Sequence, residues 1–228
     1  MAKDYLFIID PQVDFIEGGS LEVKGGTKAL DQILGILDEP WEKIYVTLDS
    51  HNPSNLGFKT NYIDGYFIKS GEPIPQDAKL IDPILREATG YYKVTAWPPH
   101  CVIGTKGWQI YEPLQKKLLS LGDKVQYLMK GQDDTKDSYS VFTDKSVMDL
   151  KGFDMLYPEN VIYYTGLAED FCVLETIKGM QKFEKMVPSN VMSELKPWKH
   201  IILGNMTAGI MSRDKIDELY DGLNIERK

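Results

Sequence analysis

The sequence predicts a single domain of the α/β class, with a doubly wound, largely parallel sheet and helices on both faces. Apolar runs of strand length alternate along the chain with segments of helical periodicity. The first run, residues 5–9, lacks polar alternation, as is typical of a parallel strand covered on both faces. With 228 residues, 43% of them apolar, the chain is long enough for one substantial core, so we expect residues 1–228 to form one domain. The sequence has no internal repeat and no glycine-rich phosphate loop.

The first half of the chain is predicted to contain two strands, residues 5–9 and 43–48, each followed by polar residues. A helix is expected between them, with Thr27 as its N-cap. Prolines and glycines interrupt residues 53–90. We therefore expect an extended loop over the sheet there, with one helix over residues 78–89.

The second half is predicted to continue the alternation of helices and strands. Near residue 172 an apolar strand ends at a glycine, turns and enters a helix whose apolar residues recur at helical spacing. The predicted elements, in chain order, are a helix over 113–121, a strand over 124–129, a helix over 146–153, a strand over 160–165, a helix over 169–184, a strand beginning at 185–187, a helix over 197–206, a strand over 209–211 and a helix over 214–220.

Composition and charge narrow the functional classes. Acidic residues outnumber basic ones by 34 to 26, and the net charge of −8 disfavours anionic partners, so we expect neither nucleic-acid nor membrane binding. The apolar run that follows the first four residues is too short for a signal peptide, and no apolar stretch is long enough to span a bilayer. We therefore expect a cytoplasmic protein. Cys101 and Cys172 are then expected to be free thiols.

Three reactive side chains lie at the ends of predicted strands. Asp10 and Lys130 each follow a strand, and Cys172 lies at a strand-to-helix turn. If they converge, they supply a proton acceptor, a cation that lowers the pKa of the thiol, and a nucleophile. The amides at a helix start would also favour the thiolate. Taken singly, each residue is weak evidence for a site, and the alternatives are a surface carboxylate, a solvated lysine and, favoured for a lone cysteine, a buried structural thiol.

A second cluster has the composition of a metal site. Asp49 and His51 stand two residues apart at a predicted strand end, and His100 follows a Trp-Pro-Pro turn. Catalytic zinc commonly has three protein ligands and one open position. Mixed oxygen and nitrogen ligation also suits iron or manganese. A hydrogen bond within the loop is the alternative explanation of the Asp-x-His pair.

Five motifs follow one another along the chain. They are Asp10-Pro-Gln-Val-Asp-Phe15 with Gly18-Gly-Ser-Leu21, Asp49-Ser-His51, Trp97-Pro-Pro-His-Cys101 with Gly104-Thr105, Lys130-Gly131 with Asp137-Ser-Tyr-Ser-Val-Phe142, and Gly166-Leu-Ala-Glu-Asp-Phe-Cys172. In this order they resemble the motifs of nicotinamidases in the isochorismatase-like cysteine hydrolase family. The C-terminal part of the chain adds nothing to the resemblance.

The resemblance implies a mechanism. Asp10, Lys130 and Cys172 match the catalytic triad of the family: Asp10 would take the thiol proton, Lys130 would hold the ion pair, and Cys172 would attack the amide to form a thioester that water releases as the acid. Backbone amides of Ala168 and Cys172 would form the oxyanion hole. The bond between Leu167 and Ala168 is usually cis in this family, and we expect it to be cis here.

The resemblance also implies a substrate site for a pyridine ring. Phe15, Trp97 and Tyr139 match aromatic positions around the ring, and Leu167 is assigned to the same site. For each aromatic residue, ordinary core packing is the alternative.

The metal implied by the resemblance is one divalent ion held by Asp49, His51 and His100, expected to be zinc, with iron or manganese as alternatives. It would bind the ring nitrogen directly or through water. Many relatives have a further histidine in the loop after Asp-x-His, whereas residues 52–58 contain none.

We therefore expect a metal-assisted nicotinamidase that hydrolyses nicotinamide to nicotinate and ammonia through a thioester on Cys172. The alternatives are another amide hydrolase of the family acting on a carbamoyl or ureido compound, a vinyl ether hydrolase of the isochorismatase type, and a non-catalytic binding scaffold. A cysteine nucleophile disfavours the second, and three intact reactive groups disfavour the third. The sequence leaves the oligomeric state open, a homo-oligomer included.

Overall fold

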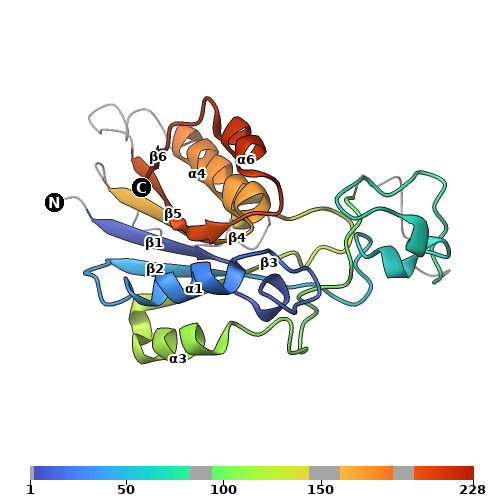
Figure 1. Cartoon of the computed structure of the whole chain (residues 1–228), viewed down its shortest axis with the longest axis horizontal. Coiled ribbons are helices and arrows are strands. Elements are labelled where there is room, and N and C mark those ends of the chain that lie inside the picture. The colour runs from blue at the N-terminus through green and yellow to red at the C-terminus, as the bar shows by residue number, and fades with distance from the viewer. Residues whose placement is uncertain (1–2, 83–93, 144–159, 187–197) are drawn as a thin grey trace.

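The computed structural model describes residues 3–82, 94–143, 160–186 and 198–228, and contains one six-stranded parallel sheet (Figure 1). Its strands are β1 (Asp4–Ile9), β2 (Lys43–Asp49), β3 (Val125–Lys130), β4 (Val161–Leu167), β5 (Lys199–Ala208) and β6 (Glu226–Arg227). The α-helices in these ranges are α1 (Gly26–Leu34), α3 (Glu112–Ser120), α4 (Leu174–Met186) and α6 (Arg213–Tyr220).

The strand order is β3-β2-β1-β4-β5-β6, so the chain builds the sheet outward from β1 in one direction and then, from β4, in the other. In doubly wound sheets, ligands bind beyond the carboxyl ends of the strands at this point of reversal. Here that point lies between β1 and β4. The predicted α/β fold with a parallel sheet is confirmed.

Each face of the sheet has its own core because successive side chains of a strand point to opposite faces. Phe7 of β1 packs in the core formed with α4 and α6, whereas Leu6 and Ile8 pack in the core formed with α1 and α3. Figure 1 shows these two pairs of helices on opposite sides of the sheet. All three side chains are fully buried, which explains why this run lacks polar residues.

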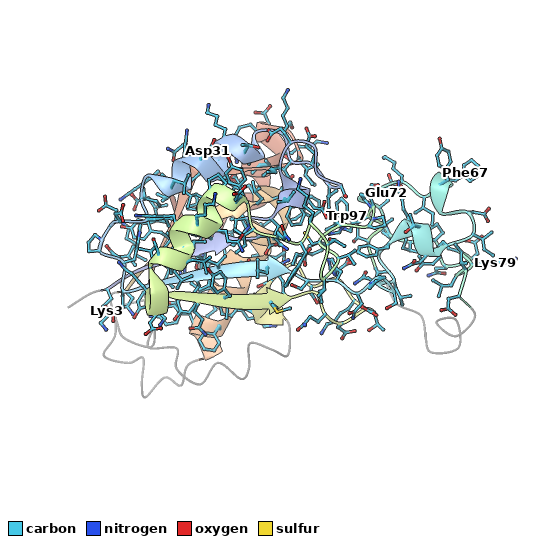
Figure 2. All side chains as sticks on the ribbon, turned by 90° about the horizontal axis from the view of Figure 1, so that it is seen from below. Lys3, Asp31, Phe67, Glu72, Lys79 and Trp97 are labelled. Atoms are coloured by element: carbon cyan, nitrogen blue, oxygen red, sulfur yellow. The ribbon has the colours of Figure 1, made fainter. Side chains whose placement is uncertain are left out.

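A protruding segment, residues 53–82, lies beyond the carboxyl ends of the strands (Figure 1). It has a small core of its own, and Figure 2 places Trp97 between it and the sheet, with Phe67 toward its far end. As expected, the segment is mostly irregular, with short 3-10 turns at Lys59–Asn61 and Gly65–Phe67. In the expected helix over 78–89, the residues up to 82 are not helical, and the rest lie outside the described residues.

The start of α1 differs from the prediction. Gly25, not Thr27, is the N-cap, with a positive φ of 84° that glycine adopts without a steric penalty. Thr27 lies in the first turn. The carboxylate of Glu17 accepts hydrogen bonds from the backbone N–H groups of Gly25 and Thr27 at 2.7 and 2.9 Å. Because this distant carboxylate satisfies the first amides, no side chain at the N-cap is needed.

The predicted helix over 197–206 was wrong: residues 199–208 form β5. The run of isoleucines there pairs with β4, Tyr163 opposite Ile201 and Tyr164 opposite Ile202, and strand pairing favours β-branched residues. The predicted strand at 185–187 was also wrong, since α4 continues to Met186. Residues 209–211 are a bend, not a strand, and the predicted helix over 146–153 lies outside the described residues.

The predicted helix over 169–184 begins as a π-helical turn, Glu169–Val173, and continues as α4 from Leu174. The other strands and helices are confirmed to within about two residues at the ends that were predicted, the usual uncertainty of boundaries. In the described ranges, no helix is long and apolar enough to cross a membrane.

Candidate active site

Three neighbouring parallel strands, β1, β2 and β3, bring Asp10, Asp49 and Lys130 together at their carboxyl ends. Lys130 Nζ lies 2.8 Å from Asp10 Oδ2, 2.9 Å from Asp49 Oδ1 and 3.4 Å from Cys172 Sγ. Asp49 and Lys130 are register partners at the ends of β2 and β3. All four residues are buried. The sequence prediction that Asp10, Lys130 and Cys172 converge therefore agrees with the structure, and Asp49 joins them.

Thr47 fixes the orientation of Asp10. Its hydroxyl donates to Asp10 Oδ1 at 2.6 Å, which leaves Oδ2 facing Lys130. The backbone N–H of Asp10 in turn contacts Thr47 O at 3.2 Å, and Asp10 itself has a positive φ of 46°. Sequence reasoning missed Thr47. Only the pairing of β1 with β2 places it beside Asp10, so no local motif could have identified it.

The turn that carries Cys172 begins where β4 ends. The peptide bond between Leu167 and Ala168 is cis, as predicted, and residues Glu169–Val173 form a π-helical turn that leads into α4. Gly166 has a φ of 106°, and a Cβ there would lie 2.0 Å from the carbonyl oxygen of Ile9. Only glycine therefore allows β4 to pass this close to β1 just before the turn.

Burial opposes the charged form of each group in this cluster. It raises the pKa of Cys172 well above the usual value, even though Lys130 acts in the opposite direction. The pKa of Asp10 is also raised, by burial, against the lowering effect of Lys130. For Lys130, burial favours the neutral form, but the Asp10 and Asp49 carboxylates outweigh it and raise the pKa well above its usual value. Burial thus opposes the thiolate that the helix start was expected to favour, and Lys130 supports it.

Asp49, His51 and His100 form a cluster suited to a metal ion, as the sequence predicted. Asp49 Oδ2 lies 3.0 Å from His51 Nε2 and 3.4 Å from His100 Nε2, and one ligand atom from each residue lies within 4.8 Å of the others. Within the part of the chain that the structure describes, these three side chains make up the whole candidate metal-binding cluster.

The outer hydrogen bonds of the two histidines support a metal-binding role. His51 Nδ1 lies 2.9 Å from the carbonyl oxygen of Gly131, and His100 Nδ1 lies 2.8 Å from that of Pro98. A carbonyl can only accept, so each ring donates from Nδ1, and Nε2 faces Asp49. Nε2 is then the ring nitrogen free to bind an ion in place of its contact with the carboxylate. Metal-bound histidines usually have such an outer acceptor. The residues present therefore fit a divalent metal ion.

Two side chains hold the segments that carry these ligands. The amide group of Gln12 donates to Asp49 O and accepts from Asp49 N, both at 2.8 Å. Asp14 Oδ2 accepts the backbone N–H of Cys101 at 2.7 Å, next to His100. Gly107 packs directly on the Asp14 carboxylate, where a Cβ would lie 2.0 Å from Oδ2. Gln12 and Asp14 both belong to the first motif, which directly follows β1 and so lies at the carboxyl ends of the strands.

An open cleft of about 340 Å³ lies beside Cys172 and reaches Asp49, His100 and Ala168. Its wall is mainly apolar and aromatic. The six residues that form this wall are Phe15, Leu21, Trp97, Tyr139, Phe171 and Ile210.

The aromatic residues of the wall contact one another. Trp97 Nε1 donates to the hydroxyl of Tyr139 at 3.1 Å, and the ring of Phe171 packs edge-on against Trp97 with centroids 5.2 Å apart. Phe15, Trp97 and Tyr139 were predicted at this site. Phe171 belongs to the fifth motif but was not predicted to contact the ring, and Ile210 lies outside all five motifs.

Leu167 is placed differently from the cleft residues. Its side chain is fully buried in the core on the α1 side, and it does not border the cleft. A Cβ on Gly26 would lie 3.3 Å from Leu167 Cδ1, so the side chain points toward the start of α1. A substrate contact by Leu167 stays a prediction, and only its backbone could make that contact.

Comparison with known proteins relates the chain to one group of enzymes. A scan against models of protein families gives no match. The nicotinamidase of Schizosaccharomyces pombe is 30% identical over 186 residues, which cover 75% of this chain and 73% of that protein.

Two solved structures share the fold. The yeast nicotinamidase bound to the inhibitor nicotinaldehyde matches with a TM-score of 0.73 and 22% identity, over 99% of this chain and 100% of the other. The pyrazinamidase of Pyrococcus horikoshii in complex with zinc matches with a TM-score of 0.61 and 18% identity, over 99% and 98%. Given the identity and coverage of the S. pombe relative, the chain belongs to the nicotinamidase family of isochorismatase-like hydrolases.

Proposed function

We propose that this protein hydrolyses nicotinamide to nicotinate and ammonia, with Cys172 as the nucleophile. The observation that carries the proposal is the position of Lys130, whose ammonium contacts Asp10 and lies 3.4 Å from Cys172 Sγ at the side of an aromatic cleft. A buried base, a cation and a thiol arranged in this way are the components of covalent amide hydrolysis. The family relationship supports the same reaction.

In the first half of the reaction, Asp10 accepts the thiol proton as Cys172 Sγ bonds to the carboxamide carbon. The raised pKa of Asp10 makes its carboxylate a better match for this proton than an ordinary aspartate. Lys130 keeps the charge of the cluster balanced while the proton moves. The carbon–nitrogen bond then breaks, Asp10 returns the proton to the leaving nitrogen, and ammonia departs from a thioester.

In the second half, Asp10 takes a proton from water while the water oxygen bonds to the carbonyl carbon. The carbon–sulfur bond breaks, nicotinate is released, and the thiol regains its proton. The backbone amides of Ala168 and Cys172 are proposed as the oxyanion hole for both steps. Such donors each contribute about 2.7–4 kcal/mol in acyl transfer.

The aromatic wall would hold the pyridine ring, with Phe15, Trp97 and Tyr139 around it and Phe171 packed edge-on against Trp97 in the same wall. Asp49, His51 and His100 would hold one divalent ion, which we propose to be zinc, with iron or manganese as alternatives. When bound, the ion would supply a Lewis-acid contact for the ring nitrogen. Of the related structures, that of the P. horikoshii pyrazinamidase is a complex with zinc.

Ammonia release from nicotinamide, with zinc supplied, tests the proposal. We expect release by the wild type, loss of release in Cys172→Ala, and retention in Cys101→Ala, which removes the other buried thiol. A folded wild-type protein that releases no ammonia from nicotinamide would contradict the proposal. Release from ureido compounds but not from nicotinamide would favour the other amide hydrolases of the family, and no turnover of either would favour a binding scaffold.

A further inference from the structure

The loop between β5 and α6 contributes one residue to the cleft. Ile210 borders the same cleft as Cys172 and Phe171, and 45% of it is exposed. It lies 38 positions after Cys172 in the sequence. No residue of this C-terminal region was assigned a role at the site.

Asp170 holds this loop against the turn that carries the nucleophile. Its buried carboxylate accepts the backbone N–H of Ile210 at 3.0 and 3.1 Å and that of Met211 at 2.7 Å. Gly209 allows the close approach, since a Cβ there would lie 2.4 Å from Ile216 Cδ1 and 3.1 Å from Asp170 Oδ1. Three hydrogen-bond contacts to one carboxylate fix the position of Ile210 relative to Cys172, two residues further along the turn.

The neighbouring residue, Glu169, fixes both ends of the same loop. Before the loop, Thr207 Oγ1 donates to Glu169 Oε2 at 2.8 Å. After it, Arg213 donates to both carboxylate oxygens at 2.9 and 3.1 Å. Arg227 Nη2 contacts Oε1 as well, at 2.5 Å. Successive acidic residues of one turn therefore anchor the loop at its ends and at its centre.

We propose that Ile210 is a specificity-determining residue of the cleft and that Asp170 is the positioning residue that presents it. The inference rests on the proposed function. Aromatic side chains supply most of the wall, whereas Ile210 is a branched aliphatic side chain at the exposed part of it. A side chain anchored through its backbone cannot easily withdraw. It would therefore limit substrates to pyridine carboxamides without a bulky substituent on the ring edge that faces it.

Steady-state kinetics with nicotinamide and a panel of methyl-substituted nicotinamides, one for each free ring carbon, test the role of Ile210. For Ile210→Ala we expect the KM of nicotinamide to rise about threefold to tenfold, with kcat within about twofold, because a uniform binding contact is lost. The preference for at least one methyl isomer, measured as kcat/KM relative to nicotinamide, should rise about tenfold. Leu219→Ala is the matched control: it removes an equally large, 37% exposed side chain on α6 that does not border the cleft.

Two further variants test the role of Asp170. Asp170→Ala should reproduce the KM and selectivity changes of Ile210→Ala, and Asp170→Asn, which keeps one acceptor oxygen, should restore part of the wild-type behaviour. The changes should not add in Asp170→Ala/Ile210→Ala if both variants remove the same contact. Additive changes would overturn the role of Asp170.

An unchanged KM and an unchanged substrate preference in Ile210→Ala would overturn the role of Ile210. The wild type is measured in the same series. If it fails to release ammonia, the proposed function fails; if it is active and Ile210→Ala behaves like Leu219→Ala, only the specificity role fails.

Discussion

Replacing Lys130 by methionine tests the charge balance of the site. Methionine fills nearly the same volume but removes the ammonium that contacts Asp10 at 2.8 Å and Asp49 at 2.9 Å. Breaking a buried ion pair by removing one partner costs about 3–5 kcal/mol, because the remaining charge stays buried without compensation. The fully buried Asp10 then loses its ion-pair partner, while the Asp49 charge still acts on it. We therefore expect a loss of unfolding free energy at the upper end of this range.

Catalysis should fail for a related reason. Without Lys130, burial and the Asp49 charge both raise the pKa of Asp10, so its carboxylate becomes protonated and cannot accept the thiol proton. Losing a general base typically lowers the rate by about 10²–10⁴-fold. The assays are urea denaturation at pH 7 and ammonia release at saturating nicotinamide.

A surface lysine provides the control. Lys117 contacts Asp38 at 2.6 Å, a shorter distance than either contact of Lys130, but Lys117 is partly exposed and Asp38 is largely exposed. Lys117→Met should therefore cost less than about 1 kcal/mol, because water screens exposed pairs. Adding Asp10→Asn to Lys130→Met should restore part of the stability and none of the activity. If Lys130→Met is as stable as Lys117→Met and keeps more than a tenth of the wild-type activity, the account of the charge cluster is refuted.

Three further perturbations test other contacts. Thr47→Val removes the hydroxyl that donates to Asp10 Oδ1 at 2.6 Å. Since hydrogen bonds to charged groups contribute about 1.5–3 kcal/mol, kcat/KM should fall about tenfold or more. The hydrogen bond lowers the pKa of Asp10, so the acid limb of the pH profile of kcat/KM should move to higher pH, and an unshifted limb would contradict this. Burial raises the pKa of Glu169, but Arg213 and Arg227 outweigh burial and lower this pKa below the usual 4.5. The ionised Glu169 therefore contributes fully to stability above pH 4.5, and this contribution is lost as the pH falls through the lower pKa of the folded state. Glu169→Gln should thus be less stable than the wild type at pH 7, with a difference that shrinks on acidification below pH 4.5; a difference independent of pH would argue against the ion pairs. After the metal has been removed with a chelator, adding zinc should raise the melting temperature of the wild type but not of His51→Ala or His100→Ala. At a free zinc concentration 100 times Kd, the gain in unfolding free energy is about 2.7 kcal/mol. Equal gains in all three proteins would place the ion elsewhere.

The site could largely be predicted because its key residues follow strands. Asp10 and Asp49 stand at or just after the ends of largely buried strands, and Lys130 ends the partly buried edge strand β3. The carboxyl ends of parallel strands meet at one edge of the sheet. Motif order placed Cys172 at the same edge. The positions of these residues at strand ends, together with the order of the motifs, therefore predict that their side chains meet.

Other parts of the fold depend on pairing that a local pattern does not encode. The isoleucines of β5 have no polar alternation, so the same run fits a helix or a buried strand, and only the partner strand β4 decides. Thr47 touches Asp10 across two strands, and Ile210 reaches the cleft through Asp170, 40 positions earlier. The raised pKa of Cys172 likewise comes from burial, whereas sequence position suggested only the opposing effects of Lys130 and the helix start.

The most direct test of the proposed mechanism is to trap the thioester. Wild-type protein is mixed with nicotinamide, quenched in acid within the first turnover, and digested for peptide mass spectrometry. We expect a nicotinoyl group on the peptide that contains Cys172, and release of nicotinohydroxamate when hydroxylamine replaces water as the acceptor. Formation of nicotinate without any adduct on Cys172 and without hydroxamate would contradict a covalent mechanism at this residue.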